Sequence, residues 1–337
     1  MTRPRVVIVG GESLLGKEVR GVLSGSGLDV RLRMLGSGEE AVLTEEKGEA
    51  SVMIPLEESE LGEAGLVFLA GTSGSGRKLW ELAARKSPRP GVIDLTYGLE
   101  GRAEAQIRAP QVEPPGWPAD PAAIHVVAHP AAIALALLLR RLAERHRLRR
   151  SVAVVFEPAS ERGRRGIDEL QKQTVQLFSF QTLPQEVFDA QLSFNLLPRY
   201  GTEAPEPLDA AELRIDRHLA TLLDRLGGIP MPSLRLVQAP VFHGHSFSLW
   251  AEFEHNPGPE ALAESLAGPG FDVRTRTHEP PTNVGAAGQS GVTVEAIETD
   301  RNHRQAAWLW MVADNHRLAA ENAVDVARQL LGAEAAR

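Results

Sequence analysis

The sequence contains no cysteine among its 337 residues. Disulfides, thiolate metal ligands, iron–sulfur clusters and mechanisms that need a sulfur nucleophile are therefore excluded. Basic residues are also too few for a nucleic-acid partner. The chain has 36 Lys and Arg against 44 Asp and Glu, a net charge of −8, whereas binding to phosphates requires a surplus of positive charge.

Long hydrophobic runs are absent as well. The longest, Ala131–Leu139, is far shorter than the roughly 20 apolar residues that span a membrane. The apolar segment near the N-terminus is too short for a secretory signal. We therefore expect a cytoplasmic protein without a membrane partner. With 43% hydrophobic residues, the chain is long enough for about two domains with cores of their own.

Apolar runs alternate with helical stretches in the first part of the chain. The predicted strands are Arg5–Val9, Leu66–Ala70, Gly91–Leu95 and His125–Val127. Helices are expected over residues 14–23, 77–84 and 131–146. Continuous apolar runs are typical of strands buried on both faces, so this order predicts a doubly wound parallel sheet. The proline-rich segment Ala109–Pro121 is expected to be an exposed loop.

The pattern changes after Arg150, where the apolar runs become typical of a sheet with one exposed face. The expected strands are Ser151–Phe156, Leu234–Val237, Phe247–Phe253 and Gly291–Ala296. Near the C-terminus, Asn315–Leu331 has apolar residues at helical spacing and is expected to pack back on the first domain.

A glycine cluster, Gly10-Gly11-Glu12-Ser13-Leu14-Leu15-Gly16, follows the first strand and precedes a helix. A pyrophosphate can bind at such a helix N-terminus, but the middle glycine of the usual motif is replaced by Ser13. Nucleotide binding and a tight turn without a ligand both remain open. The match to a phosphate loop ends at Glu18, which stands where a magnesium-binding hydroxyl is needed, and this argues against a nucleoside triphosphatase.

Two histidines, His243 and His245, lie two positions apart in an extended segment. Their side chains would face the same side, which suits a metal pair or a proton carrier. A histidine that is simply hydrogen-bonded in a loop is the alternative. His125 and His129 could join them, but no carboxylate or further ligand stands at a characteristic spacing, so no metal is expected.

Several motifs occur in the order found in one enzyme family. They are Val6-x-Ile8-Val9-Gly10, Val92-Ile93-Asp94, Pro240-Val241-Phe242-x-Gly244-His245-Ser246, Ala251-Glu252-Phe253, Trp310–Asn315 and Asn322-Ala323-Val324. On these residues the chain resembles aspartate-semialdehyde dehydrogenases over nearly its full length. The resemblance implies a Rossmann-like nucleotide-binding domain over residues 1–130 plus 315–337. It also implies a homodimer, built through an α/β domain over residues 131–314 with a largely antiparallel sheet.

The chemistry of that family begins with a thiolate in the motif A-N-P-N-C-[STA], which attacks the aldehyde. Here the matching segment is Ala128-His129-Pro130-Ala131-Ala132-Ile133, so Ala132 stands at the nucleophile position. His245 remains at the position of the family base. Glu157 replaces the family glutamine, and Gln238 replaces the arginine that binds the substrate carboxylate.

These replacements resemble the non-catalytic Usg-type members of the family. We therefore expect a protein without semialdehyde dehydrogenase activity, with a binding or assembly role and a small-molecule ligand in the former active-site cleft. The alternative is an active NAD(P)-dependent oxidoreductase of amino-acid biosynthesis, in which His245 exchanges protons with a non-covalent substrate.

Cofactor binding is expected to be weakened or lost, with NADP or NAD as the candidates. The implied contact residues are Gly10, Gly11, Ser13, Leu14, Leu15, Gly16, Gly71 and Asn322.

Overall fold

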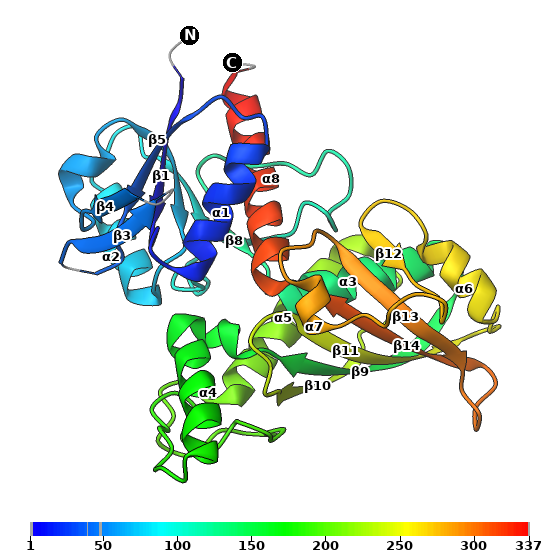
Figure 1. Cartoon of the computed structure of the whole chain (residues 1–337). Helices are drawn as coiled ribbons and strands as arrows, with labels where there is room; N and C mark the ends of the chain where they lie inside the picture. Colours follow the sequence, from blue (N-terminus) through cyan, green and yellow to red (C-terminus); the bar gives the residue numbers. More distant parts are fainter. Residues whose placement is uncertain (1–2, 39, 47–48, 336–337) are drawn as a thin grey trace. The chain divides into compact units, whose positions relative to one another are not determined.

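The computed structural model describes residues 3–38, 40–46 and 49–335. They form two compact units (Figure 1). Unit 1 comprises residues 1–128 and 319–337, and unit 2 comprises residues 129–318. The boundaries implied by the sequence, after residues 130 and 314, lie close to these divisions.

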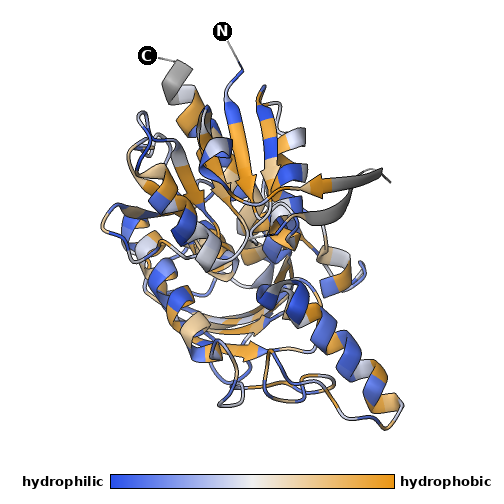
Figure 2. Cartoon of the chain, turned by 90° about the vertical axis from the view of Figure 1, so that its left-hand side faces the viewer, coloured by the Kyte–Doolittle hydropathy of each residue, from blue (hydrophilic) through white to orange (hydrophobic). Residues whose placement is uncertain are grey.

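Unit 1 contains a six-stranded sheet in which every pairing is parallel. Its strands are, in order across the sheet, β2 (Arg31–Leu35), β1 (Arg5–Val9), β5 (Ala64–Leu69), β6 (Gly91–Asp94), β8 (Ile124–Val127) and β7 (Ala105–Arg108). The predicted doubly wound α/β architecture is thus confirmed. Its central strands are among the most hydrophobic parts of the chain (Figure 2), because a parallel sheet is covered on both faces.

The other elements of unit 1 are helices and a hairpin outside the main sheet. They are α1 (Leu14–Gly25), α2 (Ser73–Ala83), the 3-10 helix η1 (Glu58–Leu61), and the antiparallel pair β3 (Val42–Glu46) and β4 (Glu49–Met53). The C-terminal helix α8 (Asn315–Ala335) contributes to unit 1 from Ala319 onward, as the sequence predicts.

The segment Ala109–Pro121 is a loop, but the prediction that it is exposed is wrong for its first part. Ala109 and Glu113 are buried. The cause is Arg108 at the end of β7, a fully buried residue whose Nε and Nη2 atoms donate to the two carboxylate oxygens of Glu113 at 2.8 and 2.9 Å. A buried guanidinium needs a carboxylate partner, and its pairing with Glu113 buries the first part of the loop.

His125 on β8 completes this buried network. Nη1 of Arg108 donates to Nδ1 of His125 at 2.9 Å, and Nη2 donates to Oε1 of Gln329 on α8 at 2.6 Å. Nε2 of His125 then donates to the carbonyl oxygen of Asp120 at 2.9 Å. Burial and, second, the positive charge of Arg108 lower the pKa of His125 to about 4. The ring is therefore neutral, with its proton on Nε2.

Unit 2 is built on a mixed six-stranded sheet. Its strands are, in order, β10 (Ser233–Gln238), β9 (Leu148–Glu157), β11 (His245–Phe253), β14 (Ala306–Ala313), β13 (Val292–Thr299) and β12 (Phe271–Val273). The three central pairings are antiparallel, and the two outer pairings are parallel. The expected largely antiparallel sheet is therefore confirmed, with one parallel pairing at each edge. Strand β14 was missed, because its sequence was interpreted only as part of a motif.

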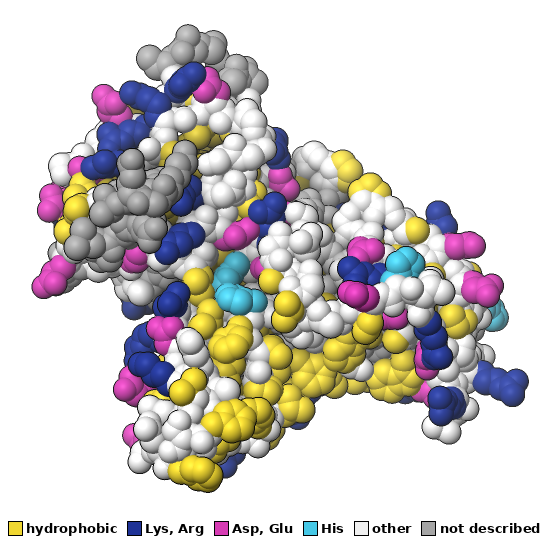
Figure 3. Space-filling model, viewed as in Figure 1, with side chains coloured by type: hydrophobic (Ala, Val, Ile, Leu, Met, Phe, Trp, Pro, Cys, Tyr) yellow, Lys and Arg dark blue, Asp and Glu magenta, His cyan; other side chains and the backbone are white. Residues whose placement is uncertain are grey.

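One face of this sheet is covered by helices, and the other is not. The helical elements are α3 (Pro130–Ala143), η2 (Ala159–Arg162), α4 (Gly163–Phe178), α5 (Leu208–Leu226), α6 (Pro259–Leu266) and α7 (Asn283–Ala286). On the uncovered face lie Val152 and Trp308, each 44% exposed, together with Trp250, which is paired with both in register. Hydrophobic side chains gather along this part of unit 2 (Figure 3).

Among the described residues, the helices are either too short or too polar to cross a membrane.

Candidate active site and its relatives

Helix α3 presents the position at which the family nucleophile would stand. Pro130 is the first helical residue, and the Nδ1 atom of His129 caps the helix by accepting from the Ala131 N–H at 3.2 Å. Ala132 follows in the first turn and is fully buried. A thiol here would be activated by the helix N-terminus, whereas a methyl group has no nucleophilic atom.

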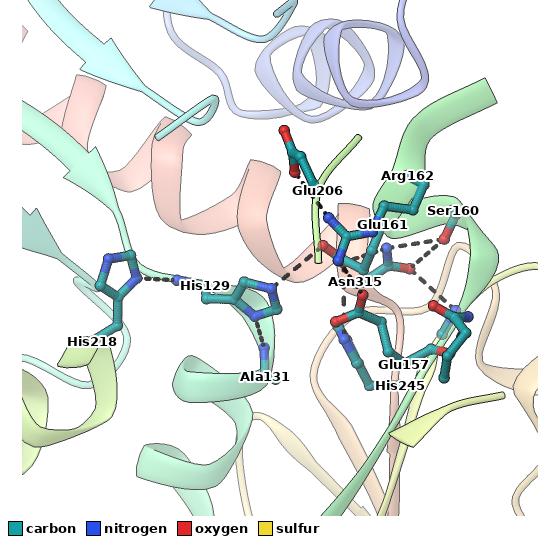
Figure 4. A network of polar contacts seen from close by, with 12 residues as sticks. His129, Ala131, Glu157, Ser160, Glu161, Arg162, Glu206, His218, His245 and Asn315 are labelled. Atoms are coloured by element: carbon teal, nitrogen blue, oxygen red, sulfur yellow. Dashed lines mark hydrogen bonds and ion pairs between the residues drawn. The ribbon is translucent and has the colours of Figure 1, made fainter. Parts of the chain in front are cut away.

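His129 and His245 lie together at the centre of a buried polar cluster (Figure 4). Their ring centroids are 5.6 Å apart. Nε2 of His129 lies 3.5 Å from one carboxylate oxygen of Glu161, and Nε2 of His245 lies 3.9 Å from the other. His218 on α5 fixes the His129 backbone, because its Nδ1 accepts from the His129 N–H at 2.9 Å.

Glu157 ends strand β9 beside this cluster. Its Oε1 accepts from Nη2 of Arg162 at 3.2 Å, and Nη1 of the same arginine donates to Glu206 at 3.0 Å. The second oxygen of Glu157, Oε2, is buried and has no hydrogen-bond partner among the described residues. The same holds for Nε2 of His245. Two unpaired polar atoms thus lie within one buried cluster, which is uncommon in folded proteins.

Gln238, which the resemblance places at the family's substrate arginine, makes its side-chain hydrogen bonds within unit 2. Its Oε1 accepts from the Tyr200 hydroxyl at 2.6 Å. Its Nε2 donates to the carbonyl oxygens of Glu157 at 2.8 Å and Ala239 at 3.1 Å. A neutral amide with these internal bonds cannot supply the charged, bidentate contact that an arginine offers to a carboxylate.

Asn315, the first residue of α8, holds the cluster together. Its Nδ2 donates to Oε1 of Glu161 at 2.7 Å and to the Ser160 hydroxyl at 3.0 Å. Its Oδ1 accepts from the Gly244 N–H at 3.1 Å. The carboxylate of Glu161 is therefore oriented by a residue from the opposite end of unit 2's sequence.

Burial controls the ionisation of these groups. It lowers the pKa of His245 to about 3, assisted by the charge of His316, and it lowers the pKa of His129 well below its usual range. Both imidazoles are therefore neutral at pH 7. Burial raises the pKa of Glu157, and burial together with the Glu157 charge raises the pKa of Glu161.

The glycine loop lies in unit 1. Gly10 has a φ of +87°, and a Cβ added there would lie 2.2 Å from the Cα of Gly71. Ser13 is the N-cap of α1: its hydroxyl accepts from the Gly16 N–H at 2.8 Å and donates to the Ala70 carbonyl at 2.7 Å. Both glycines and the serine therefore have structural roles that require no nucleotide.

Glu12 occupies the same loop with its side chain turned to the end of β2. One carboxylate oxygen accepts from the backbone N–H of Ser37 at 2.9 Å and also from the Ser37 hydroxyl. The N–H groups of Gly10 and Gly11 donate to the Leu35 carbonyl at 2.8 and 3.0 Å. These two amides are thus already engaged, and an acidic group lies where a phosphate would require donors.

The remaining predicted cofactor residues also lie in unit 1. Leu14 and Leu15 are the first two residues of α1. The buried amide of Asn322 accepts from the Gln111 N–H at 3.2 Å, which connects α8 to the loop after β7. Whether any of these residues contacts a nucleotide stays a prediction.

The four histidines considered from the sequence do not form one group. Both ring nitrogens of His125 are hydrogen-bonded within unit 1. The ring of His243 lies 6.1 Å from that of His316. Of these four, only His129 and His245 come together. Their neighbour Glu157 was named from the sequence, whereas Glu161 was missed. The available signal was the spacing of Glu157 and Glu161, which lie four positions apart where a strand ends.

Comparisons with known proteins agree with this geometry. Residues 139–318 match the family described as semialdehyde dehydrogenase, dimerisation domain. A USG-1 protein homologue of Pseudomonas aeruginosa is 29% identical over 96% of this chain and 97% of its own length. An aspartate-semialdehyde dehydrogenase of Rickettsia bellii is 31% identical over 59% of this chain, and the match spans 60% of that relative.

A solved structure shows the same relationship over the whole chain. A probable aspartate-semialdehyde dehydrogenase from Pseudomonas aeruginosa superimposes with a TM-score of 0.83 at 26% identity, and the match covers 98% of this chain and 99% of that one. Since the family match covers more than half of the chain and includes Glu157, Gln238 and His245, the chain belongs to the semialdehyde dehydrogenase family.

Proposed function

We propose that this chain is a non-catalytic member of the family with a binding or assembly role. The observation that carries the proposal is the buried methyl group of Ala132 in the first turn of α3, in a sequence without any cysteine. The family reaction needs a thiolate to capture the aldehyde before hydride transfer. Without that step, no acyl-enzyme can form.

The pocket positions around α3 support the same conclusion. The side-chain amide of Gln238 is hydrogen-bonded to Tyr200 and to two backbone carbonyls. Because an amide is neutral, Gln238 also has no charge with which to hold a substrate carboxylate. Glu157 introduces a second acidic residue next to Glu161. A ligand of this site would therefore differ in charge from aspartate semialdehyde, which carries a carboxylate.

His245 is poorly suited to the alternative function of proton exchange in a non-covalent complex. A general base works best when its pKa lies near the operating pH, and burial lowers the pKa of His245 to about 3. Its side chain is also only 1% exposed. Both features favour a binding role over acid–base catalysis.

Weak or absent NADP binding is part of this proposal. The carboxyl group of Glu12 lies in the glycine loop, bonded to Ser37, and would repel the pyrophosphate of a dinucleotide. Two loop amides are engaged with Leu35, so fewer donors remain for the phosphates.

We also propose that the chain forms a homodimer through the uncovered face of the unit 2 sheet. This face carries Val152, Trp250, Trp308 and Trp310, and the Trp310 ring lies 5.9 Å from that of Phe156. Large apolar patches on a protein surface commonly mark an interface. The matched family model, a dimerisation domain, supports this assignment.

An activity assay tests the proposed function. Purified protein with aspartate semialdehyde, NADP and phosphate should produce no NADPH above a reaction without aldehyde. His245→Asn serves as the matched control, because turnover that persists unchanged in this variant comes from a contaminating host enzyme. Turnover that the wild type shows and the variant loses would refute the non-catalytic assignment.

A further inference from the structure

The cluster around His129 contains buried polar atoms that nothing in the described chain satisfies. Nε2 of His245 and Oε2 of Glu157 both lack a hydrogen-bond partner. Both residues are at most 1% exposed, and His129 is 2% exposed. A buried unpaired group is costly, and a native example calls for an explanation such as an ion.

The distances in the cluster suit a metal ion. One ligand atom each from His129, Glu157 and His245 lies within 4.8 Å of the others. A tetrahedral ion with bonds of about 2.1 Å holds its ligand atoms about 3.4 Å apart. The three atoms would have to move closer together by up to about 1.4 Å to reach that spacing. We propose that this cluster binds one divalent transition-metal ion through His129, Glu157 and His245.

Glu161 is an acidic neighbour of the three proposed ligands. Its two oxygens already face the two imidazoles (Figure 4), and Asn315 orients the carboxylate with a 2.7 Å hydrogen bond. Orientation of a ligand by a further hydrogen bond is common in metal sites. At 13% exposure its side chain is also the most accessible of the four, so the ion would enter past Glu161.

The charges of the cluster can accommodate a cation. The carboxyl groups of Glu157, Glu161 and Glu206 interact here with Arg162 and Arg214. A dication would bind to these carboxylates and pair the buried Oε2 of Glu157. Imidazoles and carboxylates bind metals in their deprotonated forms, so uptake should release protons.

The donor set indicates the class of metal. Two imidazole nitrogens with one or two carboxylate oxygens suit zinc and its neighbours in the first transition row, and they do not suit calcium or magnesium, which prefer oxygen alone. Coordination through Nε2 of His129 would move that ring's proton to Nδ1. The cap on the Ala131 N–H would then be lost, so binding includes a small rearrangement at the start of α3.

From the sequence we expect no metal, because no carboxylate stands at a characteristic spacing from the histidines. The proposed site departs from that expectation. The fold brings Glu157 and Glu161 to the histidines from β9 and η2, and no motif records that contact. Because metal uptake is measured without any substrate, its result does not depend on whether the protein has dehydrogenase activity.

Competition with a chromophoric chelator tests the proposal on the full chain. After removal of metals with EDTA, the wild type should take up one equivalent of Zn²⁺ or Co²⁺. His129→Asn, His245→Asn and Glu157→Gln should each weaken binding at least tenfold. The matched control is His243→Asn, two positions before His245 and outside the cluster, which should bind as the wild type does.

A failure of wild-type protein to take up an equivalent, or equal uptake by all three cluster variants, overturns the proposal. X-ray absorption on the zinc-loaded wild type provides a measurement that does not depend on how the variants fold. Two imidazole ligands are expected there, and a spectrum with one or none refutes the site.

Discussion

Acid should weaken unit 1 through His125, and the size of the effect follows from the buried network. An unfolded histidine protonates near pH 6.5, whereas the folded His125 does so only near pH 4. Between these values protons bind the unfolded chain preferentially, so the contribution of His125 to stability is present above pH 6.5 and is lost as the pH falls toward 4. Burial is the main cause, and a proton on Nδ1 would in addition face the N–H of Arg108 at 2.9 Å.

The magnitude can be worked out from the two pKa values. Their difference corresponds to about 3 kcal/mol at full protonation of the unfolded chain, and about 2 kcal/mol of this is lost between pH 7.5 and pH 5.0. Urea denaturation at the two pH values, followed by pulsed hydrogen exchange on peptides from β7 and β8, measures the free energy of unfolding for unit 1 alone.

The variant His125→Asn isolates this term, because its side-chain oxygen can accept from Arg108 but does not titrate. Between pH 7.5 and 5.0 the wild type should lose about 2 kcal/mol more than this variant. His255→Asn, at an exposed histidine, should keep the wild-type difference. Parallel profiles for the wild type and His125→Asn would show that the network does not hold the ring neutral.

Three further changes probe the proposed function. Ala132→Cys should restore a reactive thiol but leave NADPH formation roughly a hundredfold or more below that of an active family member assayed alongside. The reason is that Gln238 lacks the charge that holds the substrate carboxylate, and a missing charged partner costs about 2–5 kcal/mol. Activity within tenfold of that reference would contradict this role of Gln238. Glu12→Gln keeps an acceptor for Ser37 and should tighten NADP binding about fivefold, near 1 kcal/mol, seen as a larger ligand-induced rise in melting temperature; an unchanged shift would mean that the acidic group does not oppose the cofactor. Val152→Glu on the uncovered sheet face should give monomers in light scattering, whereas the control Val284→Glu, 88% exposed on α7, should not, and equal masses for both variants would argue against this interface.

Much of the fold could be predicted from local pattern. The strand Arg5–Val9 is a continuous apolar run and was placed at its observed bounds. Strand β14 was missed although it is equally apolar, because its sequence was used only as a family signature. The loop Ala109–Pro121 was misjudged because proline content indicates a loop but not its exposure. Burial there depends on a contact with Arg108 that pattern does not reveal.

The candidate site was predicted only where a family motif exists. Ala132, Gln238 and His245 could be located by their neighbours in sequence. Glu161 and Asn315 could not, because their roles arise when η2 and the start of α8 meet in the folded unit. No periodicity connects residues 154 positions apart.

Because unit 1 includes residues from Ala319 onward, it cannot be completed before helix α8 has been synthesised. Gln329, which accepts from Arg108 at 2.6 Å, leaves the ribosome long after the sheet strands have emerged. Until then the nascent sheet lacks its last helix, and the buried guanidinium lacks one acceptor. Unit 2, a continuous stretch of sequence, needs no such delay, so the order of synthesis and the order of folding should differ in this chain.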